Sequence, residues 1–477
     1  MGSSHKKIDF TTFHNVIDGK LTSTPQTRHG INPATGKPNP EVPVATKEDV
    51  DAALEAARKA FPGWARTPLA DRQKALKALA DAVEAQKDEF IKLLVQEQGK
   101  PIFLATVEVD GAINSLRKTA ELELPEQVIE DETRIVKIRY TPLGVAVGIV
   151  PWNFPIILAV SKIAPAVVTG NAILIKPSPF TPYAGLKLVE LAQQFFPPGV
   201  VSALSGDDNL GPWLTAHPIP DKISFTGSTF TGKKVMESAA KTLKRVTLEL
   251  GGKDPAIILD DVNIEEVAPK IAQSSFLNSG QVCLAVKRIF VQESIIDKFR
   301  DALVAATKSL AVGPGTEPGV FLGPVQNKLQ YEKVKGFFDQ VANDKQTIAV
   351  GGVNPTGDGY FITPTIVDRP AENSKIVVEE PFGPIVPLLS FKTDEEAIAK
   401  ANNTSYGLGA SVWSSNLERA NRIAERVEAG TVWVNTHLEL DPTLPFGGHK
   451  ESGIGTEGGV SGLISYTNSQ TLYVKKG

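Results

Sequence analysis

The chain has 477 residues, of which 42% are hydrophobic and 22% are charged, a balance typical of a soluble globular protein. This length exceeds what one hydrophobic core usually fills, so two or three domains are expected. The formal net charge of −4 provides no basic field for nucleic acid or anionic lipid, and a single cysteine excludes an internal disulfide framework. One cysteine also fits a reducing compartment, and we expect a cytoplasmic protein.

The first third of the chain has helical patterns. Thr46 and Asp49 form a capping pair before apolar residues that recur at helical spacing as far as Phe61, and Pro62-Gly63 is expected to end that helix. A second helical pattern runs from about residue 71 to residue 98. The longest apolar stretch, residues 148–168, contains three prolines and a lysine, so it is not expected to span a membrane.

From Leu143 onward, short apolar strands alternate with helices. This alternation predicts βαβ units and a parallel sheet. The predicted strands are residues 145–150, 172–175, 200–203, 223–225, 246–250 and 256–259, and the predicted helices between them are 186–196 and 229–241.

A second α/β series begins near Gly251. Asn263 and Glu266 form a capping pair for a helix that runs to about Asn278. The further predicted elements are a strand at 288–291, helices at 294–310, 394–401 and 417–429, and strands at 410–413 and 431–435.

Two segments fit neither series. Residues 128–140 and 463–474 alternate polar and apolar side chains, as half-exposed strands do. Such strands have unpaired edges, which a partner chain can cover. We interpret them as an oligomerisation element, and pairing within one chain is an equal alternative.

Cys283 is the only cysteine, so three roles are open to it: a small buried residue of the hydrophobic core, a thiol without a function, or a nucleophile. Gly280-Gln281 interrupts a helical pattern directly before it and suits a turn that exposes a side chain. Glu249 ends an apolar strand, which is the usual place for a functional carboxylate in an open α/β sheet. These contexts favour a nucleophile and a catalytic carboxylate.

Three further stretches are candidate ligand-binding sites. The only Gly-x-Gly-x-x-Gly, residues 453–458, has no room after it for the acidic residue of a dinucleotide fingerprint, whereas residues 223–232 combine a strand, a glycine turn and a helix start that suit a pyrophosphate. Asn153 lies in a Pro-Trp-Asn-Phe-Pro turn after a strand and could donate to an oxyanion or simply cap the turn. Lys176 ends another strand and could hold ribose or phosphate, or be solvated.

Several motifs together resemble the aldehyde dehydrogenase superfamily in order and spacing. They are Pro151-Trp152-Asn153-Phe154-Pro155, Phe225-Thr226-Gly227-Ser228, Glu249-Leu250-Gly251-Gly252, Gly280-Gln281-Val282-Cys283, Glu380-Pro381-Phe382-Gly383-Pro384 and residues 445–453. The resemblance covers the chain from Ile31 onward. It implies that Cys283 is the nucleophile, Asn153 the oxyanion donor and Glu249 the general base.

The resemblance also implies a cofactor site. Lys176, Ser228 and Glu380 match the positions that hold the adenosine ribose, the pyrophosphate and the nicotinamide ribose, with Phe382 beside the nicotinamide. The other cofactor residues that it implies are Val150, Pro151, Trp152, Ser178, Pro179, Phe225, Thr226, Gly227, Leu250 and Gly251. Many members have a glutamate where this chain has Pro179, so either NAD or NADP is expected. No histidine pair has metal-ligand spacing, and no catalytic metal is expected.

The fold that the resemblance implies is α/β, with a Rossmann-like cofactor domain, an α/β catalytic domain and a strand-rich bridging element. We assign residues 1–123 and 142–250 to the cofactor domain, 251–450 to the catalytic domain, and 124–141 and 451–477 to an element that joins a homodimer or homotetramer. By position, the substrate pocket is expected to include Phe154, Ser161, Val282, Leu284, Phe446 and the loop from His437 to Leu444.

The implied reaction is oxidation of a small-molecule aldehyde to its acid, through a thiohemiacetal and a thioester on Cys283 that water activated by Glu249 hydrolyses. Two alternatives stay open at this point: a coenzyme-A-acylating aldehyde dehydrogenase, and a cysteine hydrolase or acyltransferase without nicotinamide. Glu439 and Asp441 would disfavour an anionic substrate if they face the pocket. His449 and residues 436–444 have no assigned role.

Overall fold

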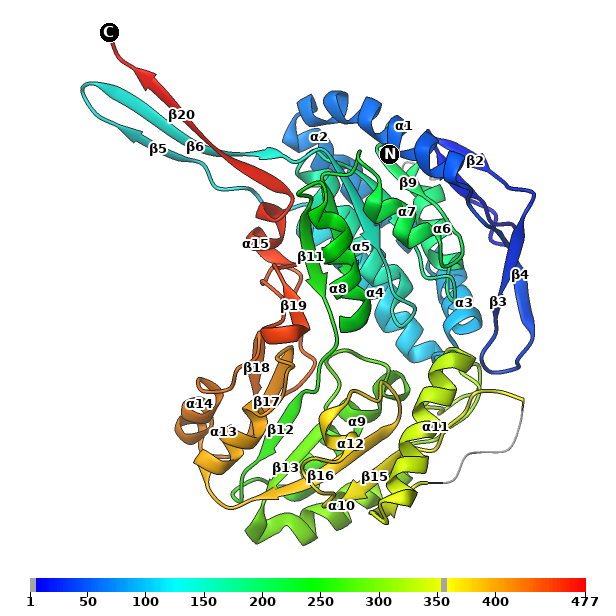
Figure 1. Ribbon diagram of the computed structural model, residues 1–477, viewed down its shortest axis with the longest axis vertical. Helices are drawn as coiled ribbons and strands as arrows, with labels where there is room; N and C mark the ends of the chain where they lie inside the picture. The colour runs from blue at the N-terminus through cyan, green and yellow to red at the C-terminus, as the bar shows by residue number, and fades with distance from the viewer. Residues whose placement is uncertain (1–5, 353–357) are drawn as a thin grey trace.

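Two large sheets and a projecting three-stranded arm make up the molecule (Figure 1). The structure is a computed structural model, and it describes residues 6–352 and 358–477. Among these residues, no helix combines the length and the apolar character that a membrane span requires.

The first sheet has the order β19-β11-β10-β7-β8-β9-β1-β2. Its five central strands are parallel, as the sequence predicts. The strands are β1 (Asn15–Ile17), β2 (Lys20–Thr22), β7 (Val145–Ile149), β8 (Ala172–Lys176), β9 (Val201–Ala203), β10 (Lys222–Thr226), β11 (Arg245–Glu249) and β19 (Gly453–Ile454). A separate hairpin pairs β3 (Thr27–Ile31) with β4 (Pro38–Pro43).

Helices cover both faces of this sheet. Alternate residues of β8 enter two different apolar cores, with Ile173 and Ile175 on one face and Leu174 on the other. Because both faces of the sheet are buried, consecutive residues of its strands are apolar. The helices are α1 (Lys47–Arg66), α2 (Leu69–Glu84), α3 (Lys87–Gln98), α4 (Ile102–Thr119), α5 (Pro155–Val168), α6 (Tyr183–Ala192), α7 (Leu210–Ala216) and α8 (Thr229–Ala240).

The second sheet has the order β14-β15-β16-β13-β12-β17-β18, and its strands are parallel except for β14 at one edge. The strands are β12 (Pro255–Ile258), β13 (Arg288–Gln292), β14 (Thr347–Val350), β15 (Thr365–Asp368), β16 (Ile385–Phe391), β17 (Gly409–Trp413) and β18 (Thr431–Val434). The helices of this part are α9 (Ile264–Phe276), α10 (Ile296–Lys308), α11 (Lys328–Asn343), α12 (Lys375–Val378), α13 (Asp394–Asn402) and α14 (Leu417–Ala424). Short 3₁₀ turns cover Leu277–Gly280, Glu293–Ile295 and Lys450–Ser452.

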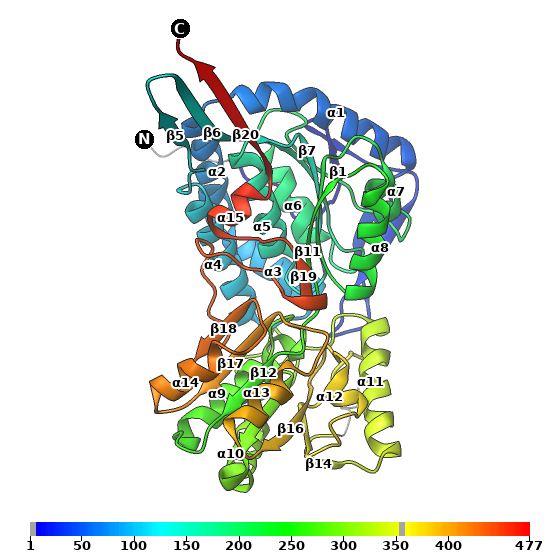
Figure 2. The same ribbon diagram turned by 60° about the vertical axis from the view of Figure 1, so that its left-hand side comes forward.

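The arm consists of β5 (Gln127–Glu130), β6 (Arg134–Pro142) and β20 (Thr467–Lys475), which follows α15 (Gly459–Ile464). Both views show it extending beyond the two large sheets (Figure 2). β6 pairs with β5 on one side and β20 on the other, so the two predicted segments pair within one chain. The first is a hairpin rather than one strand, because the Asp131 carboxylate accepts from the backbone N–H of Thr133 and turns the chain.

Several other elements differ from the predictions, among them α6, which spans Tyr183–Ala192 rather than 186–196. Helix α1 continues through Pro62 to Arg66, because Trp64 is buried and its indole donates to the Val167 carbonyl. The pattern over 71–98 forms two helices, and the buried Gln86 between them accepts from Ile8. Helix α14 ends at Ala424 rather than Ala429.

Helix α9 begins after Asn263 as predicted, but its cap differs from the prediction. Asn263 caps this helix by accepting from the backbone N–H of Glu265, and Glu266 adds no side-chain bond, so the predicted capping pair is only half formed. An Asn cap alone satisfies one of the exposed N–H groups of the first turn.

Candidate active site

The turn before Cys283 is held in an unusual conformation. After α9, Asn278 and Ser279 have φ values of 51° and 57°, in the left-handed region that non-glycine residues rarely occupy. Side chains stabilise the turn: the Ser279 hydroxyl donates to the Gly323 carbonyl at 2.6 Å, and the Gln281 amide donates to the Asn278 carbonyl at 2.8 Å. The chain therefore leaves the helix sharply and presents a partly exposed Cys283.

A close contact with the backbone of Gly383 requires a glycine at position 280. Its φ is 72°, and a Cβ there would lie 2.3 Å from the carbonyl oxygen of Gly383. The segment that carries Glu380 and Phe382 thus packs directly on the turn before Cys283.

Asn153 is buried beside this turn. Its side-chain Nδ2 donates to the Gln281 carbonyl at 3.1 Å, and its own carbonyl accepts from Asn278 Nδ2 at 3.3 Å. The same carbonyl accepts from Lys100 Nζ at 2.9 Å. One N–H of the Asn153 amide remains to donate to an oxyanion.

Lys100 and Glu108 hold Asn153 in place, and the sequence analysis did not identify either of them. Lys100 and Glu108 form a fully buried ion pair, and Glu108 also accepts from the backbone N–H of Ile156 at the start of α5. Lys100 lies over the ring of Phe154 as well, 3.9 Å from its centroid. The sequence gives no signal for them: Lys100 lies in the Gly99-Lys100-Pro101 break between α3 and α4, Glu108 lies on α4, which the sequence analysis did not predict, and charged residues are ordinarily solvated.

Glu249 ends β11 and is 4% exposed. The pKa of its carboxyl is raised to about 8, chiefly by burial and next by the nearby charge of Glu457, while the interaction with the Cys283 thiol acts to lower it. Neither carboxylate oxygen meets the geometry of a hydrogen bond with any described residue, although the thiol is close enough to interact. Glu249 is thus poised to exchange a proton near neutral pH.

Burial raises the pKa of the Cys283 thiol well above its usual range, and the charge of Glu249 adds to this effect. The charge of Lys287 acts in the opposite direction. The resting thiol is therefore neutral and needs a base, and Glu249 is the carboxylate that interacts with it.

A buried ionic cluster lies behind Glu249. Lys162 Nζ on α5 lies 2.9 Å from Glu457 Oε1 and donates to Thr226 Oγ1 at 2.8 Å. The Ser161 hydroxyl donates to Glu457 Oε2 at 3.3 Å. Ser161, expected in the substrate pocket, and Thr226, expected at the cofactor, thus both bond to this cluster.

The residues expected at the adenosine and at the pyrophosphate lie at the ends of β8 and β10. Lys176 is buried and forms no salt bridge in the described part of the chain, and its Nζ donates only a long hydrogen bond, of 3.4 Å, to the Pro177 carbonyl. Burial lowers the pKa of its ammonium to about 8. Such an unpaired buried cation fits ribose hydroxyls or phosphate oxygens.

Ser228 is the N-cap of α8 and accepts from the Thr231 N–H at 3.2 Å. The free N–H groups of this first turn suit an anion. Ser178 Oγ, near Lys176, accepts from the Phe180 N–H at 3.3 Å, and Pro179 beside it has no side-chain donor or acceptor.

The residues expected at the nicotinamide ribose meet where the two large sheets approach. Glu380 accepts from the Gly252 N–H at 3.2 Å, and its Oε1 lies 3.1 Å from Lys287 Nζ. The Phe382 and Trp152 rings meet edge to face, with centroids 5.3 Å apart. A Cβ on Gly251 would lie 2.4 Å from Glu380, so this glycine leaves room for the carboxylate.

An apolar cluster surrounds Cys283. Of the predicted pocket residues, Phe154, Val282, Leu284 and Phe446 all belong to it. The cluster also contains Leu277, Ala285, Leu408, Trp433 and Leu438, of which only Leu438 lies in the loop that the sequence analysis singled out.

Residues 436–444 pack partly against this cluster. His437 is buried, and its Nε2 donates to the Leu284 carbonyl at 2.7 Å, while burial lowers the pKa of its imidazole to about 4. Glu439 accepts from Thr436 Oγ1 at 2.7 Å, and Asp441 accepts from the Thr443 N–H at 2.8 Å. The neutral imidazole supports the loop beside the nucleophile, and both carboxylates bond within the loop.

The model of the aldehyde dehydrogenase family matches residues 21–472. The chain belongs to this family. The family resemblance and the α/β fold expected from the sequence are thereby confirmed, and the family oxidises aldehydes with NAD or NADP.

Similar proteins span almost the full chain. The aldehyde dehydrogenase LUC3 of Fusarium sp is 43% identical over 98% of this chain and 100% of its own length. A phenylacetaldehyde dehydrogenase of Pseudomonas fluorescens is 38% identical over 94% of this chain and 93% of its own. A solved structure of betaine aldehyde dehydrogenase from Staphylococcus aureus in complex with NAD+ superposes with a TM-score of 0.95 at 34% identity, covering 97% of this chain and 95% of that one.

Proposed function

We propose that this aldehyde dehydrogenase oxidises an uncharged, largely apolar aldehyde to its carboxylic acid through a thioester on Cys283. The observation that carries the proposal is the convergence of Cys283, Glu249 and Asn153 from three separate segments of the chain. The Asn153 amide bonds the turn that leads to Cys283, and the Glu249 carboxylate interacts with the thiol.

The first step is addition of sulfur to the aldehyde carbon. Ionised Glu249 accepts the thiol proton, the thiolate attacks the carbonyl carbon, and the carbonyl oxygen becomes an alkoxide. The Asn153 amide and the backbone N–H of Cys283 donate to that oxygen. A bound nicotinamide supplies an acceptor for the hydride that this carbon loses as the thioester forms.

Hydrolysis of the thioester needs a base for water. Glu249 first releases the thiol proton to solvent, and it then takes a proton from water as the hydroxide attacks the acyl carbon. The Cys283 thiolate leaves and recovers that proton from Glu249. The products are the carboxylic acid and the free thiol. Removal of this base would slow hydrolysis by about 10²–10⁴-fold, the usual contribution of general base catalysis.

The residues present fit a dinucleotide. Lys176 would contact the adenosine ribose or a 2′-phosphate, Ser228 and the first turn of α8 the pyrophosphate, and Glu380 the nicotinamide ribose. The remaining expected contacts, including Phe382 at the ring, belong to the same proposal. Because Pro179 offers no carboxylate to repel a 2′-phosphate, acceptance of both NAD and NADP is proposed.

The apolar cluster supports the substrate class. Its members beside Cys283 are apolar or aromatic. The two lysines nearby already have carboxylate partners, because Lys287 lies beside Glu380 and Lys100 pairs with Glu108. Burial of an unpaired anion there would be costly. An apolar aldehyde is therefore favoured over an anionic one, and the name of the Pseudomonas phenylacetaldehyde dehydrogenase is consistent with this.

Domain assignment and assembly are part of the proposal. We assign cofactor binding to residues 1–123 and 142–250, the nucleophile to 251–450, and homodimer or homotetramer contacts to 124–141 and 451–477. The projecting arm supports this assembly, because β5 has a free edge and carries exposed Val128 and Ile129. A cytoplasmic location is proposed because Cys283 must stay reduced.

Absorbance at 340 nm with NAD or NADP and a panel of aldehydes tests the function. Phenylacetaldehyde should be oxidised with a higher kcat/KM than succinic semialdehyde, which is an anion. A preference for succinic semialdehyde would contradict the substrate class, and no reduction with any aldehyde would contradict the activity. A requirement for coenzyme A would favour the acylating alternative instead.

A further inference from the structure

Lys287 is a buried lysine close to the nucleophile, and the steps above give it no role. Its side chain is 4% exposed. An ammonium in such a place is costly unless anions or carbonyls surround it, so its contacts indicate what it does.

The ammonium of Lys287 joins two parts of the candidate site. Nζ donates to the backbone carbonyl of Cys283 and lies 3.1 Å from Glu380 Oε1. Glu380 in turn accepts from the Gly252 N–H. One cation thus connects the backbone of the nucleophile with the carboxylate proposed for the nicotinamide ribose.

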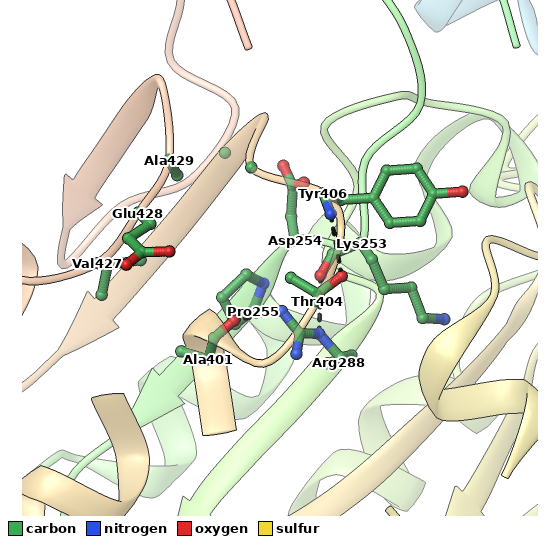
Figure 3. A pocket seen from close by; sticks show the side chains of 12 residues that line it. Lys253, Asp254, Pro255, Arg288, Ala401, Thr404, Tyr406, Val427, Glu428 and Ala429 are labelled. Atoms are coloured by element: carbon green, nitrogen blue, oxygen red, sulfur yellow. Dashed lines mark hydrogen bonds between the residues drawn. The ribbon is translucent and has the colours of Figure 1, made fainter. Parts of the chain in front are cut away.

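The main chain of Lys287 is anchored on its other side. Its N–H donates to the Asp254 carbonyl at 2.9 Å. Asp254 lines a small buried cavity together with Lys253, Arg288 and Tyr406 (Figure 3). The Asp254 carboxylate is buried, and it interacts with the backbone N–H of Gly409.

This anchoring also involves charge. Burial raises the pKa of Asp254 to about 7, and the charge of Lys287 is the largest effect that opposes the rise. Among the largest charge effects on the Cys283 thiol, Glu249 and Asp254 raise its pKa and Lys287 lowers it. Removal of the Lys287 ammonium would remove the effect that opposes these two carboxylates.

We propose that Lys287 is a positioning residue that fixes the Cys283 backbone relative to Glu380. It thereby holds the reacting sulfur at a constant distance from the nicotinamide ribose site. The inference rests on the proposed function, since it requires Cys283 as nucleophile and Glu380 as cofactor contact. The same charge favours the thiolate, which couples cofactor binding to thiol reactivity.

Two substitutions and a matched control test this role. Lys287→Met removes the ammonium, and Lys287→Arg keeps a cation. Lys253→Met is the control, because Lys253 is equally buried and donates to the Ile376 carbonyl without bonding to Cys283 or Glu380. Since the chain has one cysteine, alkylation by iodoacetamide reports on Cys283 alone.

Three quantities are measured for each variant: the rate of alkylation as a function of pH, the dissociation constant for NAD, and the unfolding temperature. For Lys287→Met, alkylation at pH 8 is expected to slow about tenfold, the effect of one unit of thiol pKa. The dissociation constant for NAD is expected to rise at least about fivefold. Lys287→Arg should keep the alkylation rate within about threefold of the parent.

The control separates positioning from packing. Lys253→Met should unfold at a lower temperature yet keep the alkylation profile and the NAD affinity of the parent. Parental alkylation and NAD affinity in Lys287→Met would overturn the inference, as would the same shifts in Lys253→Met. If Lys287→Met does not fold, Lys287→Gln replaces it, and slower alkylation is again the expected result.

These readouts do not need turnover. A parent protein that oxidises no aldehyde would contradict the proposed function. An active parent with an unchanged Lys287→Met variant would contradict only the role of Lys287.

Discussion

The pH dependence of thioester hydrolysis is a direct consequence of the environment of Glu249. Its carboxyl is buried without a hydrogen bond to any described residue, and its pKa is about 8. Because the base must be ionised to take a proton from water, the rate should rise with pH as the ionised fraction grows. About one tenth of Glu249 is ionised at pH 7, and about one hundredth at pH 6.

The expected profile has two parts. Hydrolysis should accelerate about tenfold per pH unit between pH 5.5 and 7.5 and level off above pH 8, where Glu249 is mostly ionised. Attack by free hydroxide would give the same slope without levelling off. The plateau is therefore the feature that identifies Glu249 as the base.

Rapid-quench kinetics can measure this profile. The acyl-enzyme is formed by mixing with aldehyde and cofactor, and its decay is followed at each pH. In Glu249→Gln the decay at pH 8.5 should be about 10²–10⁴-fold slower, and the plateau should be absent. A parent profile that keeps rising through pH 9, or the same plateau in Glu249→Gln, would refute the assignment.

Three further predictions concern single side chains. Cys283→Ala should abolish aldehyde oxidation and retain cofactor binding by fluorescence titration; appreciable reduction of NAD or NADP by this variant would contradict the role of the thiol. Pro179→Glu should reduce kcat/KM for NADP relative to NAD by at least about tenfold, while a parent that discriminates against NADP more than about a thousandfold must exclude the phosphate by another group. Glu457→Gln removes a charge that raises the pKa of Glu249, so the midpoint of the hydrolysis profile should fall; an upward shift would be inconsistent with the buried cluster.

Much of the fold follows from local patterns. Apolar runs bounded by turns predict the central parallel strands, because both faces of such a sheet are buried. The predicted ends of helices were wrong where contacts with residues far away in the sequence determine them. Trp64 holds the last turn of α1 by a bond to Val167, a residue far away in the sequence, and no local pattern around Pro62 reveals it.

Some residues of the candidate site could likewise be predicted from local sequence motifs, and others could not. Cys283, Glu249 and Asn153 follow strands or turns whose motifs are recognisable, so their approach could be anticipated. Lys100 and Lys287 could not, because neither a lysine between glycine and proline nor one before an apolar strand gives a sign that folding will bury it among carbonyls and carboxylates. Their roles depend on partners that only the tertiary structure brings near.

Covalent catalysis by Cys283 is the central claim, and mass spectrometry of the acyl-enzyme tests it most directly. The parent protein is mixed with NAD and phenylacetaldehyde, quenched in acid within the first turnover and digested. The peptide that carries Cys283 should gain the mass of the aldehyde less two hydrogens, which corresponds to a thioester. Formation of NADH in that first turnover, with no such adduct on Cys283, would contradict the account.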